Sequence, residues 1–111
     1  FSLPNGAQAS RVVEVEAISG NVTSILDENS QRPFFTDIMG NHQRLENGNI
    51  LVVASQEGRV MEYLANGDLA WRYDHRVKPM RNMRIYNSMV LPLEMNEAFF
   101  ESRIAACGVT N

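Results

Sequence analysis

Apolar and polar residues alternate in two stretches of the chain that resemble each other. The first spans 11–15 and the second spans 59–63, and both read Arg-Val-apolar-Glu-apolar. Each is followed by a short turn that contains Gly and then by a second apolar run, at 22–26 and at 69–73. Alternation with a period of two predicts half-buried strands, and the turns predict hairpins. A strand–turn–strand unit that recurs after roughly 40 to 50 residues is typical of a β-propeller blade.

The middle of the chain, 39–76, supplies a full set of strands for one blade. Residues 41–45 can form an inner strand, and a Glu-Asn-Gly-Asn turn leads from it into the continuous apolar run Ile50–Ala54. Such a run predicts a strand that is covered on both faces. With the strands expected over 59–64 and 69–73, it predicts a four-stranded antiparallel meander.

The flanking segments predict less regular structure. Residues 1–38 are interpreted as the end of a preceding blade and a crossover loop, under which Phe34 and Phe35 supply an apolar plug. Residues 77–111 are expected to form a closing strand over 85–91 and then a short helix. The predicted fold class is therefore an all-β propeller fragment with a C-terminal helix.

The C-terminal helix is expected to begin after Asn96 and to end near Gly108. Asn is a favourable N-cap residue, and Gly commonly ends a helix. Phe100, Ile104 and Cys107 follow an i, i+4, i+7 spacing, which predicts one apolar stripe that docks on the rest of the chain. On this interpretation Cys107 is a small buried hydrophobic residue.

The composition excludes several classes of function. The chain has 111 residues, 44% of them hydrophobic, and a formal net charge of −3, which suits one domain and argues against a general nucleic-acid binder. No run approaches the roughly 18 apolar residues of a membrane-spanning helix. The single cysteine rules out an internal disulfide and a multi-thiolate metal site. A closed propeller needs about 4 to 8 blades, so we expect a chain with one complete blade and parts of two others to be a C-terminal fragment.

Three motifs within the middle unit resemble one known family. They are Gln-Arg-Leu-Glu-Asn-Gly-Asn at 43–49, Gly-Arg-Val-Met-Glu at 58–62 and Gly-Asp-Leu-Ala-Trp-Arg-Tyr at 67–73. Together they are similar to the bacterial arylsulfotransferase-like propeller family, whose first motif usually carries Pro where this chain has Glu46. Quinoprotein-like repeats share much of this pattern and are the nearest rival.

The resemblance implies a periplasmic or secreted enzyme that moves a sulfuryl group from an aryl sulfate to a phenol. In such enzymes a histidine at the central channel takes the sulfuryl group covalently, and other His and Arg residues stabilise the charge. The resemblance implies neither a metal nor a cofactor. It implies as partners the aryl sulfate, the phenol acceptor and the remaining blades of a longer chain.

His42 is the candidate catalytic nucleophile, and Arg44 is the candidate substrate-binding residue. Both lie on the expected inner strand, two residues apart and therefore on one face. A neutral imidazole could attack sulfur while the guanidinium holds a sulfate oxygen. The alternative is a histidine that is hydrogen-bonded at a strand end, in a propeller that only scaffolds or binds a partner.

Several other polar positions have a structural and a functional interpretation. A basic cluster could bind an anionic ligand, or it could be a solvated loop, and its members are Arg72, His75, Arg76, Lys78, Arg81 and Arg84. Glu14 and Glu62 occupy equivalent repeat positions and are expected to bond to neighbouring backbone or Arg groups. Trp71 is expected to pack between blades.

Overall fold

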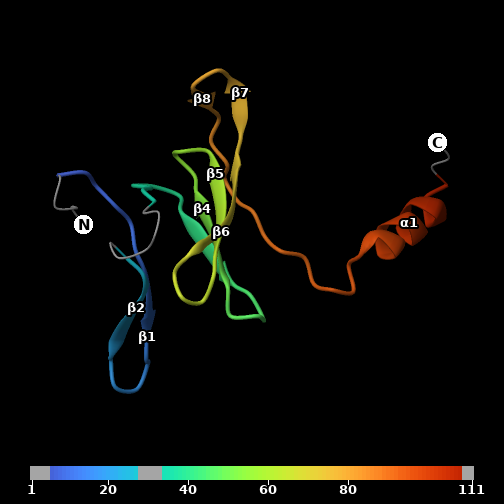
Figure 1. Ribbon diagram of the computed structural model, residues 1–111. Coiled ribbons are helices and arrows are strands. Elements are labelled where there is room, and N and C mark those ends of the chain that lie inside the picture. Colours follow the sequence, from blue (N-terminus) through green and yellow to red (C-terminus); the bar gives the residue numbers. More distant parts are fainter. Residues whose placement is uncertain (1–5, 28–33, 109–111) are drawn as a thin grey trace.

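A computed structural model describes residues 6–27 and 34–108 of the chain. Within these ranges it shows three separate antiparallel sheets followed by one helix (Figure 1). The strands are β1 (Val12–Val15), β2 (Val22–Leu26), β3 (Asn41–Arg44), β4 (Ile50–Ala54), β5 (Arg59–Tyr63), β6 (Leu69–Asp74), β7 (Arg76–Lys78) and β8 (Arg81–Asn82), and the helix is α1 (Glu97–Ala106). The predicted fold class, an all-β propeller fragment with a short C-terminal helix, is confirmed.

The central sheet is a four-stranded meander in the order β3-β4-β5-β6. Its tight turns form where the sequence supplies residues that tolerate a positive φ: Gly48 has φ 84° between β3 and β4, and Gly67 has φ 89° between β5 and β6. All five residues of β4 are buried, as the apolar run predicts. Because β3 and β6 are edge strands, the sheet is open on both sides.

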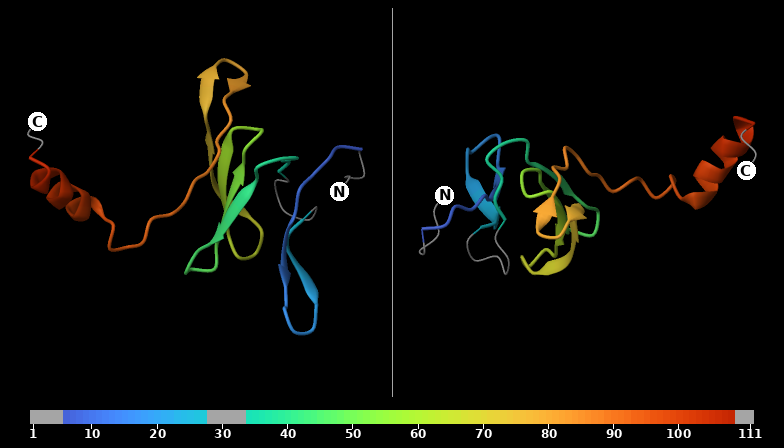
Figure 2. Two further views of the ribbon diagram at one scale, coloured as in Figure 1. Left: turned by 180° about the vertical axis from the view of Figure 1, so that it is seen from behind. Right: turned by 90° about the horizontal axis from the view of Figure 1, so that it is seen from above.

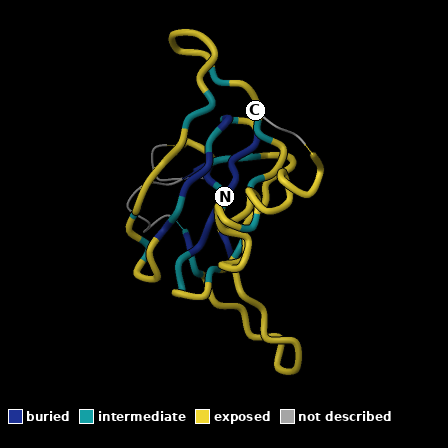
Figure 3. The backbone as a smooth tube through the Cα atoms, turned by 90° about the vertical axis from the view of Figure 1, so that its right-hand side faces the viewer, coloured by how far each residue is buried: buried dark blue, intermediate teal, exposed yellow. Residues whose placement is uncertain are grey.

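One face of this sheet packs against the β1–β2 hairpin. Alternate residues of β4 and β5, such as Val52 and Tyr63, point to this face and form a core with Val12 and Leu26 of the hairpin and with Phe34. Figure 3 shows the buried residues gathered where the two sheets meet, while the tip of the hairpin is exposed. This face is therefore covered by the preceding unit, as neighbouring blades cover each other in a propeller.

Hydrogen bonds between Ser10 and the segment at 34–36 hold the β1–β2 hairpin in place beside the sheet. The amide of Ser10 donates to the carbonyl of Phe34 over 2.8 Å. The Ser10 hydroxyl donates to the carbonyl of Thr36 over 3.0 Å and accepts from the Thr36 amide over 3.0 Å. These bonds tie the start of β1 to the segment that enters β3. The Phe34 ring, 6.2 Å from the ring of Tyr63 between centroids, is the buried plug that the sequence predicts.

The opposite face of the sheet is covered by an extended segment over 83–91. The side chain of Gln43 on β3 accepts from the amide of Val90 over 2.8 Å and donates to its carbonyl over 3.3 Å. Asn41 donates to Asn87 over 2.7 Å through their side chains. These bonds place the segment across the face that carries Leu51, Val53 and Val60, and all three of these apolar side chains are buried. Figure 2 shows this segment running alongside the sheet before the chain departs toward α1.

The strand expected over 85–91 does not form, so this prediction is wrong. Apart from the amide of Ile85, which donates to the carbonyl of Ser55 over 3.3 Å, the segment bonds to side chains on the sheet face and not to the edge of a strand. A strand requires a ladder of backbone partners, and this path offers none. Instead, the preceding residues form the small hairpin of β7 and β8.

Gly58, in the turn between β4 and β5, makes the close approach of this segment possible. Its φ is +63°, and a Cβ built on it would lie 2.1 Å from the carbonyl oxygen of Met83. We expect Gly58→Ala to destabilise the fold by at least about 2 kcal/mol, since it adds a backbone clash to the strain of a left-handed residue. Gly20→Ala is the matched control, because Gly20 has φ +72° and open space around it. Urea unfolding would measure both variants, and equal losses would contradict a clash at Gly58.

The C-terminal helix has the predicted ends but does not dock. Asn96 accepts from the amide of Phe99 over 3.1 Å as the N-cap, and Gly108 follows the helix with φ 68°. None of the helical residues is buried, and Figure 2 shows α1 lying apart from the sheets. The docking of the apolar stripe and the burial of Cys107 are therefore wrong, because the extended residues before α1 carry it away from the core. In the ranges described, no helix has the length and apolar character needed to cross a membrane.

Candidate functional site

β3 places His42 and Arg44 on the face that points toward the β1–β2 hairpin. His42 is opposite Val52 on β4, and Arg44 is opposite Ile50. Val52 and Ile50 belong to the core between the two sheets. His42 and Arg44 therefore lie on the same face of the sheet as this core, on its open edge strand. Both are exposed. The predicted common face of His42 and Arg44 is thus present.

His42 lines a cavity of about 290 Å³ between the two units. The cavity is formed by the start of β1, by the segment that enters β3, and by β3 and β4. The polar residues that share it with His42 are Ser10, Arg11, Thr36, Asp37 and Asn41. Its apolar part includes Val12, Phe34 and Val52. An imidazole, a guanidinium, a carboxylate and two hydroxyl groups therefore surround one opening.

The imidazole of His42 makes no hydrogen bond within the part of the chain that the structure describes. Its backbone amide donates to the side-chain oxygen of Asn41 over 2.8 Å, which holds the main chain at the start of β3. A ring without a fixed partner can present a nitrogen to a ligand in the cavity. Asp37 is the acidic residue among those that line the same cavity.

Arg44 lies outside this cavity and is engaged elsewhere. Its guanidinium forms an ion pair of 2.7 Å with Glu14 on β1, and the two side chains are 61% and 58% exposed. Pairs this exposed contribute about 0–1 kcal/mol, so the bond orients Arg44 more than it stabilises the fold. Arg44 instead lines a second cavity of about 450 Å³ with Gln43, Leu45 and the segment at 90–93. The structure thus places His42 and Arg44 in different cavities.

The guanidinium that shares a cavity with His42 is that of Arg11. Sequence reasoning missed this pairing, because it depends on how the first unit packs against the second. The repeat does carry a partial signal, since Arg11 and Arg59 occupy equivalent positions, directly before β1 and at the first residue of β5. How the first unit packs against the second cannot be predicted from that equivalence alone.

The two equivalent glutamates have the structural role that the repeat predicts. Glu14 binds Arg44, as described above. Glu62 accepts from the side chain of Asn49 over 2.7 Å and also from the indole nitrogen of Trp71. Trp71 is half-exposed on the outer strand, where its face remains available for packing. Both carboxylates therefore join neighbouring strands and take no part in the His42 cavity.

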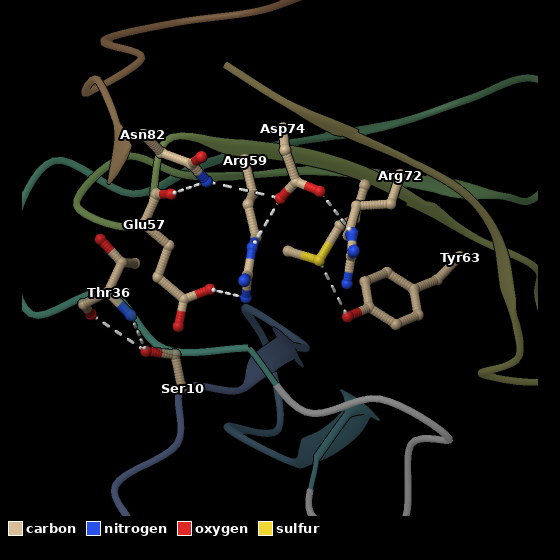
Figure 4. A network of polar contacts seen from close by, with 9 residues as sticks. Ser10, Thr36, Glu57, Arg59, Tyr63, Arg72, Asp74 and Asn82 are labelled. Carbon is tan, nitrogen blue, oxygen red and sulfur yellow. Dashed lines mark hydrogen bonds and ion pairs between the residues drawn. The ribbon is translucent and has the colours of Figure 1, made fainter. Parts of the chain in front are cut away.

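A second group of charges lies at the other edge of the sheet, around Asp74. Its carboxylate accepts from Arg59 over 2.8 Å and from Arg72 over 3.0 Å, and Arg59 also contacts Glu57 over 2.9 Å. Figure 4 shows these side chains with Asn82, whose amide donates to the backbone carbonyl of Glu57 over 2.9 Å. The bonds link the β4–β5 turn, the end of β6 and strand β8 into one network.

The network shifts the acid–base equilibria of its members. Burial alone would raise the pKa of Asp74, but the hydrogen bond from Arg59 and the charges of Arg72, Arg59 and Arg76 lower it below its usual value. For Arg59, burial alone would lower the pKa, but the hydrogen bond that it donates to Asp74 and the charges of Glu57 and Asp74 raise it. Burial, together with the charge of Glu57, raises the pKa of Tyr63 to about 12. Asp74 and Arg59 are therefore charged, and Tyr63 is neutral, near neutral pH.

Comparison with known proteins gives one match. A family model described as Arylsulfotransferase (ASST) matches residues 3–76. The chain belongs to the arylsulfotransferase family. No curated protein and no solved structure matches it. The matched range of this arylsulfotransferase-family chain contains both packed units, the His42 cavity and Arg44, and it ends at the first residue of β7.

The comparison favours the arylsulfotransferase resemblance over the quinoprotein-like rival, because the motifs at 43–49, 58–62 and 67–73 all lie inside the matched range. Across residues 6–27 and 34–108, no three His, Cys, Asp or Glu side chains gather as metal ligands would.

Proposed function

We propose that the protein to which these residues belong transfers a sulfuryl group from an aryl sulfate to a phenol, with His42 as the nucleophile. The observation that carries the proposal is the family match over 3–76, which includes His42 and the cavity that it lines. The family membership also supports a periplasmic or secreted location. Since the central sheet is open at β3 and β6, the proposal includes further blades of a longer chain as structural partners.

The proposed reaction has two displacement steps at sulfur. In the first, a ring nitrogen of neutral His42 forms a bond to sulfur while the bond from sulfur to the aryl oxygen breaks, and the phenolate leaves with the electron pair. In the second, the oxygen of an acceptor phenol forms a bond to sulfur, the N–S bond breaks, and the pair returns to the ring. The phenol proton goes to a base or to solvent. Each step exchanges one bond at sulfur for another.

Cationic groups near His42 would stabilise the sulfate oxygens in both steps. Arg11 is placed for this role, because it lines the same cavity. Arg44, the residue selected from the sequence, would reach a substrate there only after leaving Glu14. We therefore assign the first contact with sulfate to Arg11 and keep Arg44 as a second contact for a larger aryl sulfate that extends along β3.

A trapping experiment tests the covalent step. The protein is incubated with an aryl sulfate in the absence of a phenol acceptor, and its peptides are analysed by mass spectrometry under conditions that preserve N–S bonds. We expect an added SO₃ group on the peptide that contains His42. His75 is the internal control, because it is the second of the two histidines and lies outside the cavity.

Two outcomes would contradict the proposal. One is release of a phenol with the SO₃ group found on a residue other than His42. The other is the absence of both phenol release and labelled peptide in the presence of the complete set of blades. The second result would favour the non-catalytic scaffold, because a family fold does not by itself specify an activity.

A further inference from the structure

A cavity of about 500 Å³ lies at the β5–β6 side of the central sheet, away from the edge strand that carries His42. It is an open cavity lined by the β4–β5 turn, by the start of β5, the end of β6 and the β7–β8 hairpin. The charged residues that line it are Glu57, Arg59, Arg72, Asp74, Arg76 and Arg81. Its size falls within the range of pockets that bind small molecules.

The lining has two more guanidinium groups than carboxylates. Arg59 is bound by Glu57 and Asp74, and Arg72 is bound by Asp74. Neither Arg76 nor Arg81 forms an ion pair with any residue that the structure describes. The excess positive charge is therefore contributed by the two arginines on β7 and β8 that have no carboxylate partner there.

The β7–β8 hairpin holds these two arginines over the cavity. Arg76 is opposite Asn82, and Arg81 is opposite Lys78, in the register of the two strands. The hairpin is fixed to the sheet, because Asn82 donates to the carbonyl of Glu57 over 2.9 Å and the amide of His75 donates to the carbonyl of Gly58 over 2.9 Å. The tight fit at Gly58 adds to this fixation.

The structure places only some members of the basic cluster predicted from the sequence at this cavity. Arg72, Arg76 and Arg81 line the cavity, whereas His75, Lys78 and Arg84 do not. A solvated loop would scatter its charges around the hairpin. Here four arginines line one open cavity. Figure 4 shows two of them, Arg59 and Arg72, held by the carboxylate of Asp74.

We propose that this cavity binds a small doubly charged oxyanion: free sulfate, free phosphate or a phosphate monoester. The two excess guanidinium groups match the two negative charges of such a group. Arginine is suited to this ligand, because its planar fork donates two parallel hydrogen bonds to adjacent oxygens. The site is separate from His42 and does not depend on the proposed transfer reaction.

Calorimetric titration with inorganic sulfate and with inorganic phosphate, at fixed ionic strength in chloride, tests the proposal. We expect saturable binding to the chain, and a loss of affinity of about tenfold or more in the double variant R76Q/R81Q, because each lost charge-assisted hydrogen bond is worth about that factor. R84Q is the control for a charge lost outside the cavity, since it makes the same kind of substitution at one exposed arginine that does not line the cavity. It should bind within about twofold of the unaltered chain. Circular dichroism confirms that each variant is folded.

Three outcomes would overturn the inference: no binding beyond that of chloride, an equal loss in R84Q and in R76Q/R81Q, or unchanged binding in the double variant. Phenyl phosphate distinguishes the sources of the ligand. Tighter binding of this ester than of inorganic phosphate would indicate a phosphate monoester, and equal or weaker binding would indicate the free ion. His42→Ala should leave the titration unchanged, so failure of the transfer reaction and failure of this site are separable.

Discussion

His42→Ala is expected to lower the turnover of an aryl sulfate by at least about a thousandfold in the protein that contains these residues. The alanine side chain has no atom that can form a bond to sulfur, so the covalent route through this position is lost. The remaining rate would come from binding and from the charges around the cavity, including Arg11. Steady-state release of the phenol measures the effect.

His75→Ala is the matched control for this experiment. His75 lies after β6, where its ring stacks on Tyr73 with a centroid distance of 6.4 Å, and it does not line the His42 cavity. Its removal should change turnover by less than about threefold. If both variants retained turnover, His42 would not be the nucleophile. If both lost it, the effect would lie in folding, which circular dichroism would reveal.

Tyr63→Ala is expected to destabilise the fold by about 3–5 kcal/mol, the loss typical of truncating a buried aromatic side chain. Tyr63 is 0% exposed on β5 and packs against Phe34, and its hydroxyl contacts the sulfur of Met61 over 3.5 Å. Removal of the ring would leave a cavity where the hairpin unit meets the central sheet. Urea unfolding, followed by circular dichroism, gives the change in the free energy of unfolding.

Tyr73→Ala provides the comparison, because Tyr73 lies on the neighbouring strand β6 but is 53% exposed. Its loss should cost less than about 1 kcal/mol, as is usual for surface positions. Equal losses in the two variants would mean that the core between the hairpin and the sheet does not stabilise the fold. A selective loss in Tyr63→Ala would show that the two units unfold together.

Local sequence patterns predicted the central sheet well because each of its elements is encoded within a few residues. The apolar side chains of the continuous run Ile50–Ala54 are all shielded from water only if both faces of the strand are covered. The structure buries all five residues. The Asn-Gly pair at 47–48 predicts the turn that follows β3, and Gly48 adopts the required positive φ. The sequence also predicted Asn96 as the N-cap of the helix, and its side chain accepts from the amide of Phe99.

The path of the segment over 83–91 could not be predicted in the same way. Its composition, with Ile85 and Val90 among polar residues, resembles that of a strand. What decides its conformation is the amide side chain of Gln43, which lies far away in the sequence and bonds to Val90 across the sheet face. The exposure of Cys107 has a similar origin, because it depends on where this segment carries the helix.

The candidate site was predictable in part. Strand alternation correctly placed His42 and Arg44 on one face, but it could not show that Glu14 binds Arg44 or that Arg11 enters the His42 cavity. Both facts depend on the packing of one unit on another. For the basic cluster, the sequence identified the members, while only the folded hairpin separates those that line one cavity from those that do not.

The match to the family model ends at residue 76, but residues beyond 76 also take part in burying the central sheet. Leu51, Val53 and Val60 are shielded by main chain that lies beyond that boundary, through contacts such as those of Gln43 with Val90. A protein truncated at residue 76 would therefore expose one entire apolar surface of its best-formed sheet. Residues that carry no recognisable family motif thus shield the same sheet as those that do, and the limits of homology and of the packed core differ in this chain.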